Sequence, residues 1–404
     1  MSGTSRRGFL RTSAALSGAA VLAPSLQGLI ACAANKTAGI TRMTRPELAP
    51  RGAGGYGLLR EAGPELALPA GFNYSVLSFT GKPMSDGHPT PGAFDGMAAF
   101  RLRNGNVRLI RNHENRDPAA TARVKGDPAR AYDARAGGGT TSLEVRLASD
   151  GSATLVRDFV SLGGTIVNCA GGPTPWGSWL TCEESSAGSV SGWGQEHGYI
   201  FEVPATAEAQ VEAVPIRAMG RFIHEAVAVD PDTGVVYETE DRLTAGFYRF
   251  VPKQRGALQS GGLLQMLAID GRPNYDTATG QRMGTSLPAR WVNIDDPDPS
   301  GAGGTDPAAV FNQGFARGGA RFSRLEGSWW GDKGVFFHAT NGGDAAVGQV
   351  WFYRPEGRER GSLTLVFESP SVEMLEYPDN ITVSPRGGIV LCEDGAGEQF
   401  VRGL

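Results

Sequence analysis

One short unit recurs along this 404-residue sequence and limits what the chain can fold into. Each copy has a polar start, an apolar segment, a turn of Gly, Pro or Asp, a second apolar segment and a polar or acidic end. Four clear copies and one looser copy cover residues 94–115, 168–184, 224–241, 324–341 and 378–394. In the clear copies the polar ends are 14 or 15 residues apart, as for Glu225 and Glu240. This pattern predicts a β-hairpin in every copy.

Further apolar segments follow the hairpins, such as residues 246–251 and 349–353. Four antiparallel strands in each repeat are typical of a propeller blade, which is stabilised by packing against its neighbours. A content of 58 Gly and 25 Pro agrees with many short strands and tight turns. We predict an all-β fold, a β-propeller of six four-stranded blades with the functional site on the central axis.

Two parts of this ring are less regular. Residues 242–320 separate two units widely, so they form either a sixth, degenerate blade or an insertion. Closure of the ring is predicted to pair residues 72–79 with residues 399–404. No linker divides the chain from residue 45 onward, and residues 45–404 are therefore predicted to be a single propeller domain.

The N-terminus has the pattern of an export signal. Arg6 and Arg7 form a twin-arginine motif, and a small-residue apolar stretch covers residues 14–30. We predict a twin-arginine signal peptide at residues 1–34 and a periplasmic or extracellular location. Residues 29–32 resemble a lipobox, in which Cys32 would carry a lipid anchor; simple cleavage of the leader is the alternative.

Charge and cysteine content limit the expected partners. The formal net charge is -4, and no basic run follows the N-terminus, so nucleic acid is not expected as a partner. The cysteines after the leader are odd in number: Cys169, Cys182 and Cys392. Cys182 and Cys392 occupy equivalent positions in their units and are predicted to be structural, and paired if those units are neighbours. Cys169 is either a buried small hydrophobe or a thiolate with a function, and its place in an Asn-Cys-Ala-Gly-Gly turn favours the thiolate.

The predicted hairpins bring polar side chains together at the axis, because the two ends of an antiparallel hairpin lie side by side. The expected inner residues are Asp95, Cys169, Glu225, Glu326 and Asp379, and the acids expected close behind them are Glu114, Glu183, Glu240 and Glu393. A single acid at a strand end is usually solvated, but acids gathered in this number repel one another unless cations neutralise them. Oxygen ligands suit Ca²⁺, and one thiolate among carboxylates suits iron.

Arg324 lies two residues before Glu326 and is expected on the same face of its strand. It either pairs with the carboxylates or binds an anionic substrate oxygen. Phosphate is the anion that both Ca²⁺ and a guanidinium group favour.

Several segments resemble the PhoX-type alkaline phosphatases, in the same order over nearly the whole chain after the leader. They are residues 95–97 (Asp-Gly-Met), 112–115 (Asn-His-Glu-Asn), 168–172 (Asn-Cys-Ala-Gly-Gly), 174–177 (Thr-Pro-Trp-Gly), 181–184 (Thr-Cys-Glu-Glu), 224–227 (His-Glu-Ala-Val), 322–327 (Phe-Ser-Arg-Leu-Glu-Gly) and 379–381 (Asp-Asn-Ile). The resemblance implies a six-bladed propeller with two irons (Fe³⁺), which a Cys thiolate bridges, and several Ca²⁺ ions.

By its motif, Cys169 is similar to the bridging cysteine of that family. Glu225, Glu326 and Asp379 resemble ligands of the metal cluster, and Arg324 resembles a contact to phosphate. The implied reaction is hydrolysis of phosphate monoesters, with diesters left open. This chain lacks insertions that longer members of the family carry between blades.

Two other functions fit the same pattern. One is a calcium-dependent propeller hydrolase that acts on lactones or phosphotriesters, and the other is a propeller that binds a partner without catalysis. Metal content separates the three hypotheses. The sequence leaves the natural substrate and the oligomeric state open.

Overall fold

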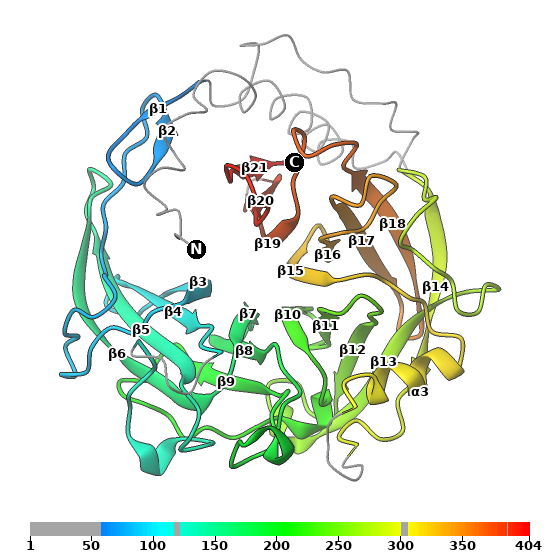
Figure 1. The fold of residues 1–404 in the computed structure, drawn as a ribbon, viewed down its shortest axis with the longest axis horizontal. Coiled ribbons are helices and arrows are strands. Elements are labelled where there is room, and N and C mark those ends of the chain that lie inside the picture. Colours follow the sequence, from blue (N-terminus) through cyan, green and yellow to red (C-terminus); the bar gives the residue numbers. More distant parts are fainter. Residues whose placement is uncertain (1–57, 117–121, 300–305, 386) are drawn as a thin grey trace.

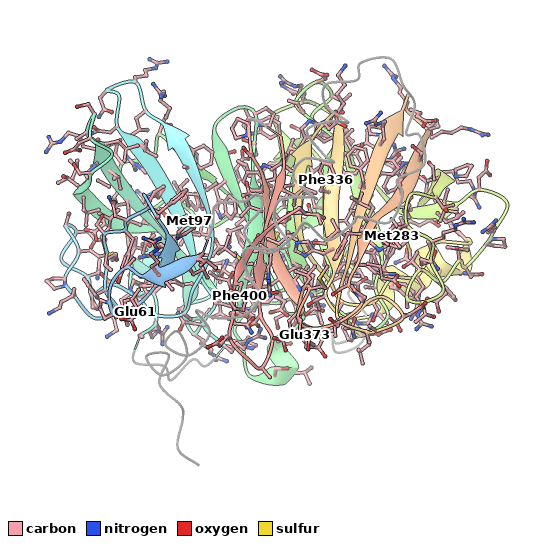
Figure 2. The ribbon with its side chains drawn as sticks, turned by 90° about the horizontal axis from the view of Figure 1, so that it is seen from above. Glu61, Met97, Met283, Phe336, Glu373 and Phe400 are labelled. Carbon is pink, nitrogen blue, oxygen red and sulfur yellow. The ribbon has the colours of Figure 1, made fainter. Side chains whose placement is uncertain are left out.

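The computed structural model describes residues 58–116, 122–299, 306–385 and 387–404. Short antiparallel sheets stand side by side around a common centre (Figure 1), and their strands run across the thickness of the molecule (Figure 2). The predicted signal peptide at residues 1–34, with Cys32, lies outside the described residues. Among the residues that are described, no helix is long and apolar enough to cross a membrane.

Five groups of antiparallel strands follow one another along the chain, and we call them blades 1 to 5. Blade 1 contains β3 (Phe94–Arg101), β4 (Val107–His113), β5 (Gly138–Leu147) and β6 (Ala153–Thr165). Blade 2 contains β7 (Asn168–Pro173), β8 (Ser178–Glu183) and β9 (Ile200–Pro204). Blade 3 contains β10 (His224–Val229), β11 (Val236–Glu240), β12 (Phe247–Pro252) and β13 (Gly262–Ile269). Blade 4 contains β15 (Leu325–Gly331), β16 (Gly334–Ala339), β17 (Gln349–Glu356) and β18 (Arg360–Glu368). Blade 5 contains β19 (Pro378–Val383), β20 (Ile389–Glu393) and β21 (Val401–Gly403).

The remaining elements connect or flank the blades. They are the hairpin of β1 (Leu59–Glu61) and β2 (Ala67–Pro69), β14 (Ser286–Asn293), the helix α3 (Ala309–Ala316), and four short 3-10 turns, η1 (Pro128–Arg130), η2 (Ser189–Ser191), η3 (Arg217–Met219) and η4 (Leu258–Ser260). The predicted all-β class is confirmed. Three blades have the four predicted strands, whereas blades 2 and 5 have three each in the described residues.

The innermost strands contact one another in the order β3, β7, β10, β15 and β19. Glycine permits this close approach. A Cβ atom added at Gly96 would lie 2.7 Å from Cα of Ala170, and one at Gly327 would lie 2.8 Å from the backbone nitrogen of Ile381. The glycine that follows Asp95 or Glu326 is therefore required by the packing of the neighbouring blade. No extensive contact joins β19 to β3 in the described chain, so the sixth blade stays a prediction.

Residues 242–320 do not form a blade of their own. They supply β12 and β13 of blade 3, and then β14, which pairs with β13 on one side and with β18 on the other. Blades 3 and 4 are thereby joined into one nine-stranded sheet, and the alternative of an insertion fits the structure.

The predicted closure of the ring is wrong. Residues 72–79 are all described and contain no strand. The C-terminal strand β21 pairs with β20 inside blade 5.

An aromatic core fills the space between blades 3 and 4. The rings of Phe247 and Phe337 are stacked with centroids 4.1 Å apart, and Tyr237, Trp291 and Tyr353 surround them. This apolar packing holds β10 and β15 beside each other, and with them the acidic residues at their starts.

Candidate metal centre

The five innermost strands share one irregularity. In blade 2, Asn168 pairs with Glu183 and the next recorded pair is Gly171 with Thr181, so the register shifts between Asn168 and Gly171. The same shift follows the first residue of β3, β10, β15 and β19. Such a bulge redirects a side chain from the regular alternation of a strand. The residue inside the bulge is Asp95, Cys169, Glu225, Glu326 or Asp379, which are the five predicted inner residues.

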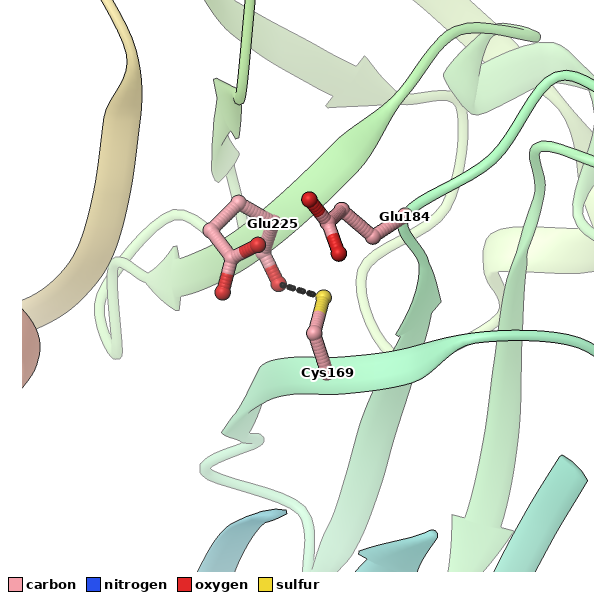
Figure 3. Close-up of side chains that lie close together, drawn as sticks. All are labelled: Cys169, Glu184 and Glu225. Carbon is pink, nitrogen blue, oxygen red and sulfur yellow. Dashed lines mark hydrogen bonds between the residues drawn. The ribbon is translucent and has the colours of Figure 1, made fainter. Parts of the chain in front are cut away.

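These side chains form two groups that could each hold a metal ion. In the first group, the Sγ atom of Cys169 and carboxylate oxygens of Glu184 and Glu225 all lie within 4.8 Å of one another (Figure 3). In the second group, carboxylate oxygens of Glu225, Glu326 and Asp379 do the same. Glu225 belongs to both groups, so the two candidate sites are adjacent.

The spacing and the donor atoms fit metal binding. Two ligand atoms that each lie about 2.4 Å from one ion are at most about 4.8 Å apart. The first group offers a thiolate with two carboxylates, which suits iron, and the second offers only oxygen, which suits calcium.

Burial makes the charged forms of these side chains unfavourable unless a cation is bound. The pKa of Glu225 is raised well above its usual range by burial, and further by Glu326. Burial also raises the pKa of Glu326 and of the Cys169 thiol well above their usual ranges. In Glu184 burial raises the pKa to about 8, and in Asp95 burial and then Asp379 raise it to about 9. Without cations these acids therefore retain protons at neutral pH, and a bound metal would displace them.

The acids at the ends of the second strands have a different role. Both oxygens of Glu183 are occupied, by the backbone N–H groups of Ile166, Gly198 and Tyr199 and by His197. Glu240 accepts from the backbone N–H of Gly246, and Glu393 accepts from that of Phe400. Tyr199, Gly246 and Phe400 each directly precede the third strand of their blade. Glu183, Glu240 and Glu393 therefore hold the third strand in place, and the structure brings none of them into either metal-capable group.

The next residue along the chain faces the start of the inner strand. The backbone N–H of Glu184 donates to the carbonyl of Val167 at 2.9 Å, and the N–H of Asp241 donates to the carbonyl of Ile223 at 3.2 Å. The equivalent bonds in blades 1, 4 and 5 start from Glu114, Thr340 and Asp394. This bond places the residue after the second strand beside the bulge in every blade. Glu114 is of this kind and lies close enough to Asp95 to raise its pKa.

Sequence reasoning missed Glu184 and Asp241. The signal was present, since an acid follows the last residue of the second strand in blades 1, 2, 3 and 5. Aligning the units on their last strand residue, His113, Glu183, Glu240 and Glu393, would have found it. Counting 14 or 15 residues from the inner residue of each unit led instead to the strand end itself in blades 2, 3 and 5.

Arg324 lies at the edge of the second group. Its Nε and Nη2 atoms donate to Asp241 at 3.0 and 2.8 Å, and Nη2 also donates to Glu326 at 3.0 Å. The side chain is 39% exposed, and its Nη1 atom has no hydrogen-bond partner among the described residues. Arg324 thus forms the expected ion pairs and keeps donors for an anion.

The three described cysteines are all free thiols. Cys182 and Cys392 belong to blades 2 and 5, which are not neighbours, so their pairing is excluded in this arrangement. The Cys169 Sγ atom is buried and lies 3.5 Å from the carbonyl oxygens of His224 and Glu225.

Comparisons with known proteins bear on the family and on the fold. The family described as alkaline phosphatase PhoX matches residues 54–404. No curated protein sequence matches. The solved structure of Pseudomonas fluorescens PhoX in complex with vanadate, a transition state analogue, is similar to this chain with a TM-score of 0.61 and 18% identity, over 82% of each chain. A calcium structure of a Trichoderma reesei carbohydrate-active enzyme of family AA12 has 12% identity over 81% of this chain and 98% of its own, but its TM-score of 0.37 is too low to support an argument.

Proposed function

Because the chain belongs to the PhoX alkaline phosphatase family and is therefore a phosphoric ester hydrolase, we propose that it hydrolyses phosphate monoesters at a calcium- and iron-dependent centre on the axis of its blades. The observation that carries this proposal is the pair of ligand groups that share Glu225. One group contains the single axial thiolate, and the other contains only carboxylates. A site for one calcium alone would not need Cys169.

In this proposal Cys169, Glu184 and Glu225 hold iron, and Glu225, Glu326 and Asp379 hold calcium. When bound, the metals supply positive charge at the phosphoryl group and lower the pKa of a bound water. The acids must lose their protons to bind, so metal affinity rises with pH through the range near pH 8 where Glu184 titrates. This behaviour agrees with an enzyme that works at alkaline pH.

Arg324 is proposed to bind and orient the phosphoryl oxygens. Asp241 holds its guanidinium plane through two hydrogen bonds, which leaves Nη1 for the substrate. A guanidinium group fixed in this way offers a charge that needs little reorganisation as the phosphoryl group is transferred.

We also propose that the enzyme acts outside the cytoplasm. The support is the twin-arginine motif at Arg6 and Arg7 within residues 1–34, and Cys32 is the candidate for a lipid anchor. Small phosphate esters are the proposed substrates, and nucleic acid is not proposed as a binding partner.

The test is elemental analysis of the exported protein together with its turnover of p-nitrophenyl phosphate. Iron and calcium in the protein, with turnover that a chelator abolishes, would support the proposal. Calcium alone with lactone or phosphotriester hydrolysis would favour the calcium-dependent hydrolase. A protein with no tight metal and no turnover would favour the binding propeller.

A further inference from the structure

A second arginine, Arg116, lies beside the axial acids. It follows β4 by three residues, and its Nη2 atom donates to both Glu114 and Glu184. Its side chain is 61% exposed, and Nε and Nη1 have no recorded partner among the described residues. Exposed ion pairs of this kind add little to folding stability, so stability alone gives no reason for an arginine here.

Arg116 and Arg324 have matching positions. Arg116 bonds to Glu184, a member of the first metal-capable group, and Arg324 bonds to Glu326, a member of the second. The two groups share Glu225, so one guanidinium lies next to each of two adjacent metal-capable groups. Arg116 comes from blade 1 and reaches blade 2, whereas Arg324 precedes blade 4 and bonds to Asp241, which directly follows β11 of blade 3.

We propose, on the basis of the proposed function above, that Arg116 is a second phosphate-binding residue and makes the site selective for monoesters over diesters. A phosphate monoester at alkaline pH carries two negative charges, because its second pKa is about 6, whereas a diester carries one. Each cation beside the phosphoryl group therefore gains more from a monoester than from a diester. The Nε and Nη1 donors of Arg116, which have no partner among the described residues, are the atoms that would bind the additional anionic oxygen.

The experiment uses the metal-loaded, full-length mature protein and the variants Arg116→Gln and Arg116→Lys. Arg354→Gln is the matched control. Arg354 is also partly exposed and pairs with an acid, Asp332, and both lie at the end of blade 4 that is opposite to Glu326. For each protein, kcat/KM is measured with p-nitrophenyl phosphate and with bis(p-nitrophenyl) phosphate, and the dissociation constant of inorganic phosphate is measured by calorimetry. Because both esters are assayed on one sample, the ratio of their kcat/KM values does not depend on the fraction of protein that holds metal.

We expect Arg116→Gln to lower the monoester kcat/KM roughly tenfold to a hundredfold, the usual effect of losing one charged hydrogen-bond donor. The diester value should fall less than about threefold, and phosphate should bind about tenfold more weakly. Arg116→Lys should retain part of the selectivity because it keeps the charge, and Arg354→Gln should match the parent protein.

An unchanged ratio of monoester to diester in Arg116→Gln would overturn the inference. So would phosphate binding that is equal in Arg116→Gln and the parent protein. A parent protein that hydrolyses neither ester would instead contradict the proposed function, and calorimetry with phosphate would then still decide the role of Arg116.

Discussion

The acids in the bulges and the acids at the strand ends are two sets of side chains that recur in the same hairpins, yet their surroundings differ. Glu183 and Glu225 are both almost fully buried. Glu183 accepts hydrogen bonds from three backbone N–H groups and from His197, whereas the groups around Glu225 are other acids and the Cys169 thiol. Recurrence and burial therefore do not identify a metal ligand. A buried acid whose nearest neighbours are other acids is the one that needs a cation.

The strongest test of the metal-binding role of the bulge residues is to change the thiol. Cys169→Ser keeps the shape but removes the soft ligand, so iron and any colour of the protein should be lost and turnover should fall by more than about a hundredfold. Cys182→Ser, also buried and free, is the matched control and should keep its iron. Absorbance spectra and elemental analysis decide between them. Normal iron content in Cys169→Ser would move the centre away from the first group.

Removing the metals should make the stability of the protein depend on pH through the acids beside the axis. Glu184 and Asp95 have pKa values raised to about 8 and about 9 from ordinary values of 4.5 and 3.8. Between about pH 4.5 and 9 the folded metal-free protein therefore holds protons that the unfolded chain has released, so stability must fall as pH rises. We expect the Tm of chelated protein to drop by about 10 °C between pH 5 and pH 9.

The metal-loaded protein is the control for that measurement. Its ligands are deprotonated, so its Tm should change little over the same range. A chelated protein that becomes more stable as pH rises would show that the raised pKa values of the axial acids are wrong.

A pair of matched amide substitutions tests the assigned roles directly. Glu183→Gln weakens several buried hydrogen bonds and should lower the free energy of unfolding by about 2 kcal/mol while iron content is kept. Glu225→Gln resembles the protonated acid, so the metal-free protein should keep its stability while metal binding is lost. Urea unfolding and elemental analysis of both variants check this, and the opposite pattern would exchange the two roles.

Arg324→Lys should have a smaller effect, of about tenfold on turnover. Lysine keeps the charge but loses the planar guanidinium group that bonds to Asp241 through two nitrogen atoms. Stability should change by less than about 1 kcal/mol, because the ion pair is partly exposed. Equal losses of stability and turnover would make Arg324 a structural ion-pair residue.

The sequence predicted the hairpins and the five bulge residues because both depend on local pattern and short spacing. It predicted the strand-end acids Glu183, Glu240 and Glu393 beside the inner residues, whereas the residue beside each bulge is the next one along the chain. The two positions differ by one residue, and only strand pairing distinguishes them. Glu184 and Asp241 were missed for this reason. The pairing of β14 with β18 was not predictable either, because it joins segments about 75 residues apart through packing that no local pattern encodes.

The smallest expected effect concerns Cys392 of blade 5, which is compared with Cys182 of blade 2. Cys182 and Cys392 each directly precede the last residue of the second strand, yet Cys182 is buried and Cys392 is exposed. The difference follows from their neighbours, since blade 3 packs against blade 2 beside Cys182, whereas no blade among the described residues packs beyond blade 5. Cys392→Ser should therefore change the free energy of unfolding by less than about 0.5 kcal/mol, and Cys182→Ser by about 1 kcal/mol or more. In native protein a thiol reagent should label Cys392 and spare Cys182. Protection of Cys392 from the reagent would show instead that this face is covered, as a sixth blade would require.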